Sequence, residues 1–178
     1  MQPSIRRATE ADLPAVQRLV NGAYVVEEFF LDGGRIDLDE LVTTARSGGQ
    51  FIVLEEPGTD EMIGCVCVTF GARTGFISLL SVIPTRQGQG FSLLLVQAAE
   101  FHMIDAGCEL ARLEVVNLRG ELIPYYERLG FAVVGTTPFP KPMEAEARRS
   151  PHRNAKGALT SRQTSEPCSG SRCPNSQR

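Results

Sequence analysis

The stretch SVIPTRQGQGFSLLLVQAAEF, residues 81–101, joins an apolar run to a helical pattern through a proline and a turn with two glycines. The residues before it, GFISLLS, are apolar almost throughout, which is typical of a central strand buried on both faces. We therefore predict a strand over residues 75–83 and a helix that ends near Gly107. The expected apolar positions of this helix are Phe91, Leu94, Leu95, Ala98 and His102.

The flanking sequence predicts further helices and strands of one α/β or α+β layered domain. Thr9 is a good N-cap, and Asp12 stands three residues later, where a capping box has an acidic or amide side chain. Apolar residues at helical spacing predict helices over residues 9–24, 36–47 and 120–130. Short apolar runs between turn residues predict strands over residues 50–56, 61–71, 110–116 and 131–137.

The pattern ends near Lys141, so we divide the chain into a folded domain, residues 1–140, and a tail, residues 141–178. The tail contains one Leu, one Met, four Pro and no aromatic or β-branched aliphatic residue. It has eight Lys/Arg against three Asp/Glu, whereas the first 140 residues have ten against eighteen. Because such a tail buries too little apolar surface to offset its ordering entropy, we predict that it is disordered.

Composition narrows the function classes. The acidic charge of the first 140 residues argues against nucleic acid as a ligand, and no apolar run reaches the length of a membrane span. The chain has five cysteines, and its first residues do not resemble a secretory signal, so free thiols and a cytoplasmic location are expected. Cys65 and Cys67 fall on one face of a predicted strand without further ligands at metal spacing, so we expect core packing and no metal site.

The turn at residues 87–92 has the chemistry of an anion cradle. The first turn of a helix has unpaired backbone N–H groups and about half a positive charge, and glycine lets an anionic group approach the backbone. A Walker loop would need a lysine after Gly90, and a dinucleotide fingerprint would need a third glycine at Leu93. An ordinary strand-turn-helix that happens to contain two glycines remains an alternative to a phosphate site.

Two separated motifs resemble those of the GNAT acetyltransferases over residues 4–138. The first is Gln-x-x-Gly-x-Gly/Ala, matched by Gln87, Gly90 and Ser92, with serine at the last position. The second is an asparagine after a strand, then a helix that ends in Tyr-x-x-x-Gly-Phe, matched by Asn117 and by YERLGF at residues 126–131. The distance from Asn117 to Tyr126 is longer than in the common form of this motif.

The resemblance implies an α+β fold in which a mixed central sheet is flanked by helices and two strands separate to admit acetyl-CoA. The backbone freed by this separation would bind the pantetheine arm, and Asn117 would also hydrogen-bond it. The turn would bind the pyrophosphate, and Arg86 would add positive charge near the phosphates. The residues that this assigns to the cofactor are Leu80, Ser81, Val82, Arg86, Gln87, Gly88, Gln89, Gly90, Phe91, Ser92 and Asn117.

The implied activity is N-acetyl transfer from acetyl-CoA to a primary amine of a small molecule or peptide, by a monomer or homodimer. Tyr126 occupies the position of the acid that protonates the leaving CoA thiolate. The base is less defined: Glu28 is our choice, in the segment that shapes the acceptor pocket, with Glu27, Glu114 and a water relay as alternatives. Tyr125 is expected only to pack.

The resemblance breaks at the C-terminus. Sheets of this family close with a last strand inserted between the fifth and sixth, and nothing after residue 140 reads as a strand. We therefore expect this strand to be missing, as after a frame shift or an altered splice. The alternative function is a degenerate domain that binds CoA without turnover.

Overall fold

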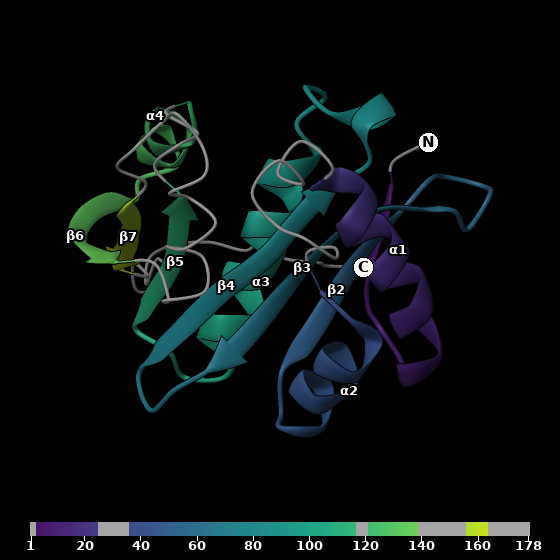
Figure 1. The fold of residues 1–178 in the computed structure, drawn as a ribbon, viewed down its shortest axis with the longest axis horizontal. Coiled ribbons are helices and arrows are strands. Elements are labelled where there is room, and N and C mark those ends of the chain that lie inside the picture. The colour runs from purple at the N-terminus through teal and green to yellow at the C-terminus, as the bar shows by residue number, and fades with distance from the viewer. Residues whose placement is uncertain (1–2, 25–35, 117–120, 139–155, 164–178) are drawn as a thin grey trace, which may run out of the picture.

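The computed structural model describes residues 3–24, 36–116, 121–138 and 156–163, which form a mixed sheet with helices on both faces (Figure 1). The sheet order is β1-β2-β3-β4-β5-β7-β6. The predicted α+β class with a mixed sheet is confirmed. The strands are β1 (Ser4–Arg7), β2 (Gln50–Glu55), β3 (Met62–Phe70), β4 (Thr74–Val82), β5 (Leu110–Val116), β6 (Ala132–Pro138) and β7 (Lys156–Gln163).

The helices begin where the sequence supplies caps. A 3₁₀ turn, Glu10–Asp12, leads into α1 (Leu13–Ala23), and the Asp12 carboxylate accepts a hydrogen bond of 2.7 Å from the Thr9 N–H. Helix α2 (Leu38–Arg46) has a capping box between Asp37 and Glu40. The remaining helices are α3 (Phe91–Asp105) and α4 (Leu122–Arg128).

Side chains along β2 and β3 point alternately to the two faces of the sheet, so the core consists of two clusters, one on each face. Phe51, Val53 and the cysteines Cys65 and Cys67 pack under α1 and α2. The intervening residues face α3 and α4, in a cluster that includes Ile52, Leu54, Val66 and Val68. Because side chains of a strand alternate between its two faces, the apolar runs of β2 and β3 serve both clusters. The predicted core packing of the two cysteines is confirmed, since both are buried free thiols.

Helix α3 packs with a different phase from the one predicted. Its buried side chains are Leu95, Val96, Ala99 and Met103, whereas Phe101 is 68% exposed. Of the predicted positions, Leu95 is buried, and Phe91 and Ala98 pack against the cluster while partly buried. Because this helix is apolar around most of its circumference, spacing alone does not determine which face meets the sheet.

The sheet separates between β4 and β5. These strands pair in parallel only over their first residues, from Thr74 with Leu110 to Ile77 with Leu113, although β4 continues to Val82 and β5 to Val116. A bulge interrupts the opposite edge of β4, where Leu79 has a positive φ of 51° and the register with β3 shifts. The strand separation that the resemblance implied is therefore present at the carboxyl ends of β4 and β5.

Strand β7 corrects the prediction of a missing last strand. Lys156–Gln163 pairs antiparallel with β5 on one side and with β6 on the other, so this part of the tail is ordered in the sheet. An interior strand forms backbone hydrogen bonds along both of its edges, and these bonds stabilise it. The sequence prediction counted only apolar side chains and therefore missed this contribution. Residues 141–155 and 164–178, the rest of the predicted disordered tail, lie outside the described residues.

No helix in the described part of the chain is both long enough and apolar enough to cross a lipid bilayer.

Candidate active site

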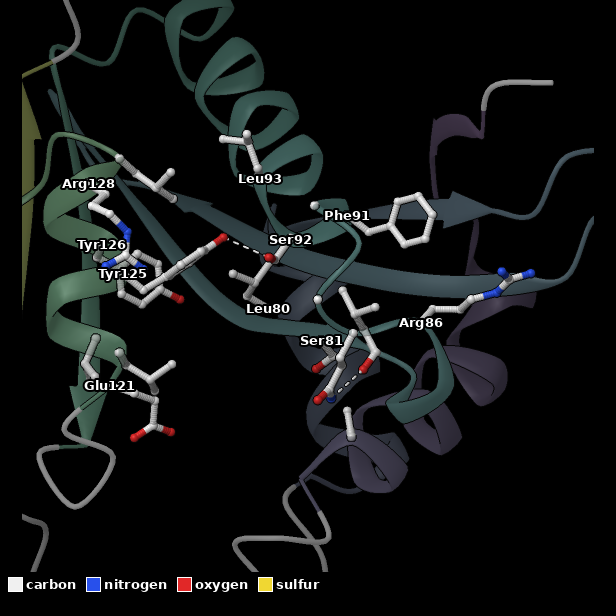
Figure 2. Close-up of a pocket in the computed structure, with 18 of the residues that line it drawn as sticks. Leu80, Ser81, Arg86, Phe91, Ser92, Leu93, Glu121, Tyr125, Tyr126 and Arg128 are labelled. Atoms are coloured by element: carbon white, nitrogen blue, oxygen red, sulfur yellow. Dashed lines mark hydrogen bonds between the residues drawn. The ribbon is translucent and has the colours of Figure 1, made fainter.

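A pocket of about 670 Å³ lies where β4 and β5 separate, and it extends from the turn before α3 to α4 (Figure 2). Residues from α1, β4, the turn, α3, β5 and α4 line it. Most of the predicted cofactor residues are brought together here: Leu80, Ser81, Val82, Arg86, Gln87, Gly88, Gly90, Phe91 and Ser92. Gln89 is not part of the lining; its side-chain amide donates a hydrogen bond of 3.4 Å to the Thr85 carbonyl.

Three predicted residues lie outside the described part of the chain. They are Glu28, the proposed base, Glu27, one of its alternatives, and Asn117, the proposed pantetheine ligand. These assignments stay predictions.

The turn before α3 is built to present backbone to the pocket. Gly88 and Gly90 have φ values of 74° and 84°, and a Cβ at either position would have no neighbouring atom within 4 Å. Glycine is therefore required by conformation, and the space beside the backbone is open for a ligand. The Gln87 amide fixes the start of the turn by donating a hydrogen bond of 3.1 Å to the Val82 carbonyl.

The start of α3 supplies N–H groups that the helix itself does not use. Its first backbone bonds run from Leu93 and Leu94 to the Gly90 carbonyl, so the N–H groups of Phe91 and Ser92 precede the hydrogen-bond ladder. The helix is 15 residues long, and its dipole adds partial positive charge at this end. These features fit an anionic group such as a pyrophosphate.

Arg86 has a protein partner. Its guanidinium forms an ion pair with Glu56, and its side chain extends away from α4 (Figure 2). Glu56 therefore offsets part of the charge that was predicted to reach the phosphates. A second arginine in the lining, Arg128 of α4, is exposed, and no sequence signal had indicated it.

Two tyrosines of α4 line the pocket from the side opposite the turn. Tyr126 is 8% exposed, and its ring packs edge-to-face on Tyr125 and Phe131, with centroids 5.1 and 5.8 Å apart. The Tyr125 hydroxyl is hydrogen-bonded to the Ser92 Oγ across 2.8 Å (Figure 2). Tyr125, which was expected only to pack, therefore also forms a polar contact inside the pocket.

The wall nearest α1 was not predicted in detail. Tyr24, at the end of α1, lines the pocket, and its hydroxyl donates a hydrogen bond of 3.4 Å to the Leu80 carbonyl. Glu114 of β5, one of the alternative bases, also lines the pocket and is exposed. Glu114 points away from the face on which Leu113 and Val115 pack into the core, since neighbouring strand residues alternate.

The site thus combines an anion cradle, a stretch of β4 backbone that is not paired with β5, the phenols of Tyr24, Tyr125 and Tyr126, and the carboxylates of Glu114 and Glu121. The described residues contain no group of three or more His, Cys, Asp or Glu side chains that could hold a metal ion. The available chemistry is binding of a long anionic ligand by backbone groups and proton transfer by Tyr126 or Glu114.

Comparison with known proteins agrees with this geometry. The family model described as "Acetyltransferase (GNAT) family" matches residues 13–131. No curated protein sequence matches the chain. Among solved structures, the ribosomal-protein-S18-alanine N-acetyltransferase from Escherichia coli superposes with a TM-score of 0.73 at 16% identity, over 97% of this chain and 100% of that one.

Two further structures share the fold. A putative acetyltransferase from Salmonella typhimurium, solved with its cofactor acetyl-CoA, gives a TM-score of 0.71 at 20% identity and covers 97% of this chain and 100% of its own. A spermidine N-acetyltransferase chimera from Vibrio cholerae and hSSAT gives a TM-score of 0.69 at 18% identity and covers 92% of this chain and 96% of its own. Members of this family are acetyl-CoA-dependent N-acetyltransferases. With its family model matched over most of the domain and its sheet separated at the pocket, this chain belongs to the GNAT acetyltransferase family.

Proposed function

We propose that this protein transfers the acetyl group of acetyl-CoA to a primary amine of a small molecule or peptide. The observation that carries the proposal is the pocket between β4 and β5, with the first turn of α3 at one end and Tyr126 in its wall. A binding site for an unrelated anion would need the turn alone. It would not need a separated sheet or a phenol facing that separation.

The proposed cofactor contacts come mainly from backbone groups. The N–H groups of the turn, residues 87–92, would bind the pyrophosphate, and Gly88 and Gly90 leave the necessary space. The β4 backbone at Leu80, Ser81 and Val82, beyond its pairing with β5, would bind the pantetheine arm as a strand would. When bound, acetyl-CoA supplies an activated acyl group.

The acceptor amine must lose a proton, because an amine with a pKa near 10.4 is mostly protonated at neutral pH. Two described acidic side chains, Glu114 and Glu121, line the pocket, and Glu114, on β5 beside the strand separation, is the one proposed as the base. Its exposed carboxylate would attract the ammonium group and accept its proton. Glu28 remains the alternative from the sequence.

Tyr126 is proposed to protonate the departing sulfur. A thiolate with a pKa of roughly 8.5 leaves more readily when a proton is supplied, and a phenol with a pKa near 10 can donate one. The packing of Tyr126 against Tyr125 and Phe131 would keep its hydroxyl in one orientation.

The wider setting is proposed from charge and thiol chemistry. Buried free thiols at Cys65 and Cys67 support a reducing, cytoplasmic location. The acidic folded domain supports a small-molecule or peptide acceptor over nucleic acid. A monomer or homodimer is proposed.

Titration calorimetry with acetyl-CoA tests the binding half of the proposal. The wild-type protein should bind, and Gly90→Glu should weaken binding by about 100-fold or more, because a carboxylate would face the pyrophosphate. Gly48→Glu is the matched control: Gly48 has a similar φ of 92° and an equally open Cβ position, but it follows α2, outside the pocket lining. A folded wild-type protein that does not bind at millimolar ligand would refute the proposal.

A turnover screen tests the second half. Acetyl-CoA consumption should be measured with amino acids, polyamines, aminoglycosides and peptides with free N-termini. Acetylation of any of these amines supports the enzyme, and the product identifies the acceptor class. Binding without turnover across the screen would favour the alternative, a domain that binds CoA but does not catalyse transfer.

A further inference from the structure

The hydrogen bond between Ser92 and Tyr125 joins the two helices that flank the pocket. Ser92 lies in the first turn of α3, Tyr125 lies in α4, and the residues are 33 apart in sequence. Both side chains are partly buried and both line the pocket, where their hydroxyl oxygens are 2.8 Å apart. Figure 2 shows the Tyr125 side chain reaching from α4 toward the start of α3.

This contact lies where the sheet provides no connection. Backbone pairing between β4 and β5 ends at Ile77 and Leu113, so no ladder joins the strands beside the pocket. Helix α4 packs against β6 and through side chains such as Leu122 and Leu129 against the core cluster. Beside these apolar contacts, the hydrogen bond requires a specific distance and angle. It therefore adds a directional restraint on the position of α4 relative to α3.

The two hydroxyls occur as a matched pair. The motif at residues 87–92 resembles one that ends in glycine or alanine, and Ser92 adds to it a hydroxyl that needs a partner when half-buried. The partner comes from Tyr125, whose ring packs edge-to-face on Tyr126 with an interplanar angle of 72°. A restraint on Tyr125 therefore also restrains Tyr126.

We propose that Ser92 and Tyr125 form a clasp that sets the width of the pocket and positions the Tyr126 ring beside it. The inference rests on the proposed function, in which the pocket holds CoA and Tyr126 donates a proton. Tyr125 is a positioning residue in this scheme. The hydrogen bond between Ser92 and Tyr125 persists when the cofactor binds. Neither hydroxyl contacts the cofactor; the two affect its binding through the bond that they form with each other.

A double-mutant cycle tests the clasp, with Ser92→Ala, Tyr125→Phe and the double variant. Each single change removes one hydroxyl and keeps the remaining packing. With CoA as the probe, each single variant should raise Kd about fivefold, because without the bond the pocket has its binding-competent width only part of the time. The double variant should also be about fivefold weaker, because the same bond is lost in all three. Ser92→Thr retains a hydroxyl and should bind within about twofold of wild type.

Two results would overturn the proposal. A double variant about 25-fold weaker would mean that the hydroxyls contact the cofactor independently, since independent effects multiply. Unchanged affinity in all variants would mean that the bond does not set the pocket.

Unfolding without ligand separates this inference from the proposed function. Either single variant should lower the denaturant midpoint by the same amount, and the double variant should lower it no further. Failure of the wild-type protein to bind CoA would refute the proposed function, whereas additive midpoint changes would refute the clasp.

Discussion

The two halves of the sheet are held together differently. In the first half, β1 to β4 are joined by antiparallel ladders, with bulges between β2 and β3 and between β3 and β4, and α1, α2 and α3 cover the two faces. In the second half, β7 lies between β5 and β6 in the described part of the sheet, and β5 meets β4 along a short parallel segment. The candidate site lies at this weakly paired junction. A rigid first half can hold the cofactor cradle while the second half presents the reactive side chain across a gap.

Removal of the Tyr126 hydroxyl should give the largest effect on activity. It should also separate catalysis, assigned to the second half of the sheet, from cofactor binding, assigned to the first. Tyr126→Phe should lower kcat by roughly 10²–10⁴, the typical contribution of a positioned acid, with little change in the Kd of acetyl-CoA. Steady-state kinetics and calorimetry on the same preparation would measure both. Gly90→Glu, in the first half, should show the opposite pattern, with loss of binding. Wild-type turnover by Tyr126→Phe would leave Tyr126 as a core residue only.

A proline in β7 should weaken the second half selectively. Leu159 pairs with Glu114 of β5 and Gly135 of β6, and Leu159→Pro would remove a ladder N–H from an interior strand. The expected loss of unfolding free energy is about 1–3 kcal/mol, the cost of leaving a backbone acceptor without its donor. Amide exchange should accelerate in β5 and β6 but not in β2 and β3, whereas Leu159→Val, which keeps the N–H, should leave exchange unchanged. Unaltered exchange in Leu159→Pro would contradict the placement of β7.

The smallest expected effect is a loss of unfolding free energy at alkaline pH, and it comes from two buried thiols in the first half of the sheet. Burial raises the pKa of Cys65 to about 12 and that of Cys67 to about 11, whereas an unfolded thiol titrates near 8.5. Above about pH 8.5 the unfolded chain therefore releases protons that the folded chain keeps, and stability falls as pH rises. Between pH 8.5 and 9.5 the loss is about 1 kcal/mol per thiol.

Denaturant unfolding in reducing buffer at these two pH values would measure that loss. A variant with Cys65→Val and Cys67→Val should lose this part of the pH dependence, since valine fills a similar volume without titrating. An unchanged slope in that variant would show that other groups cause it.

Local sequence patterns predicted most of the fold and the first half of the site. The capped helices, the alternating strands and the turn with Gly88 and Gly90 depend on residues close together in the chain. Contacts between distant residues were not predictable in this way. The Ser92–Tyr125 bond and the ion pair of Arg86 with Glu56 each join residues about thirty positions apart, and no local pattern encodes them.

The errors have related physical causes. Strand β7 was missed because the prediction weighed apolar side chains, whereas an interior strand is also stabilised by backbone bonds to two neighbours. The phase of α3 was misjudged because that helix has apolar side chains on several sides, including the exposed Phe101.

The position of β7 also governs the order in which the protein can assemble on the ribosome. Strand β6 is synthesised before β7, yet β7 is its strand partner in the described part of the sheet. The nascent chain therefore holds β5 with an open edge until residues 156–163 emerge and insert between two strands already made. During that interval the open edge is a template for pairing with other chains. Synthesis that stops before Lys156 would leave this edge exposed permanently, and the fragment would then be bound by chaperones or degraded by proteases.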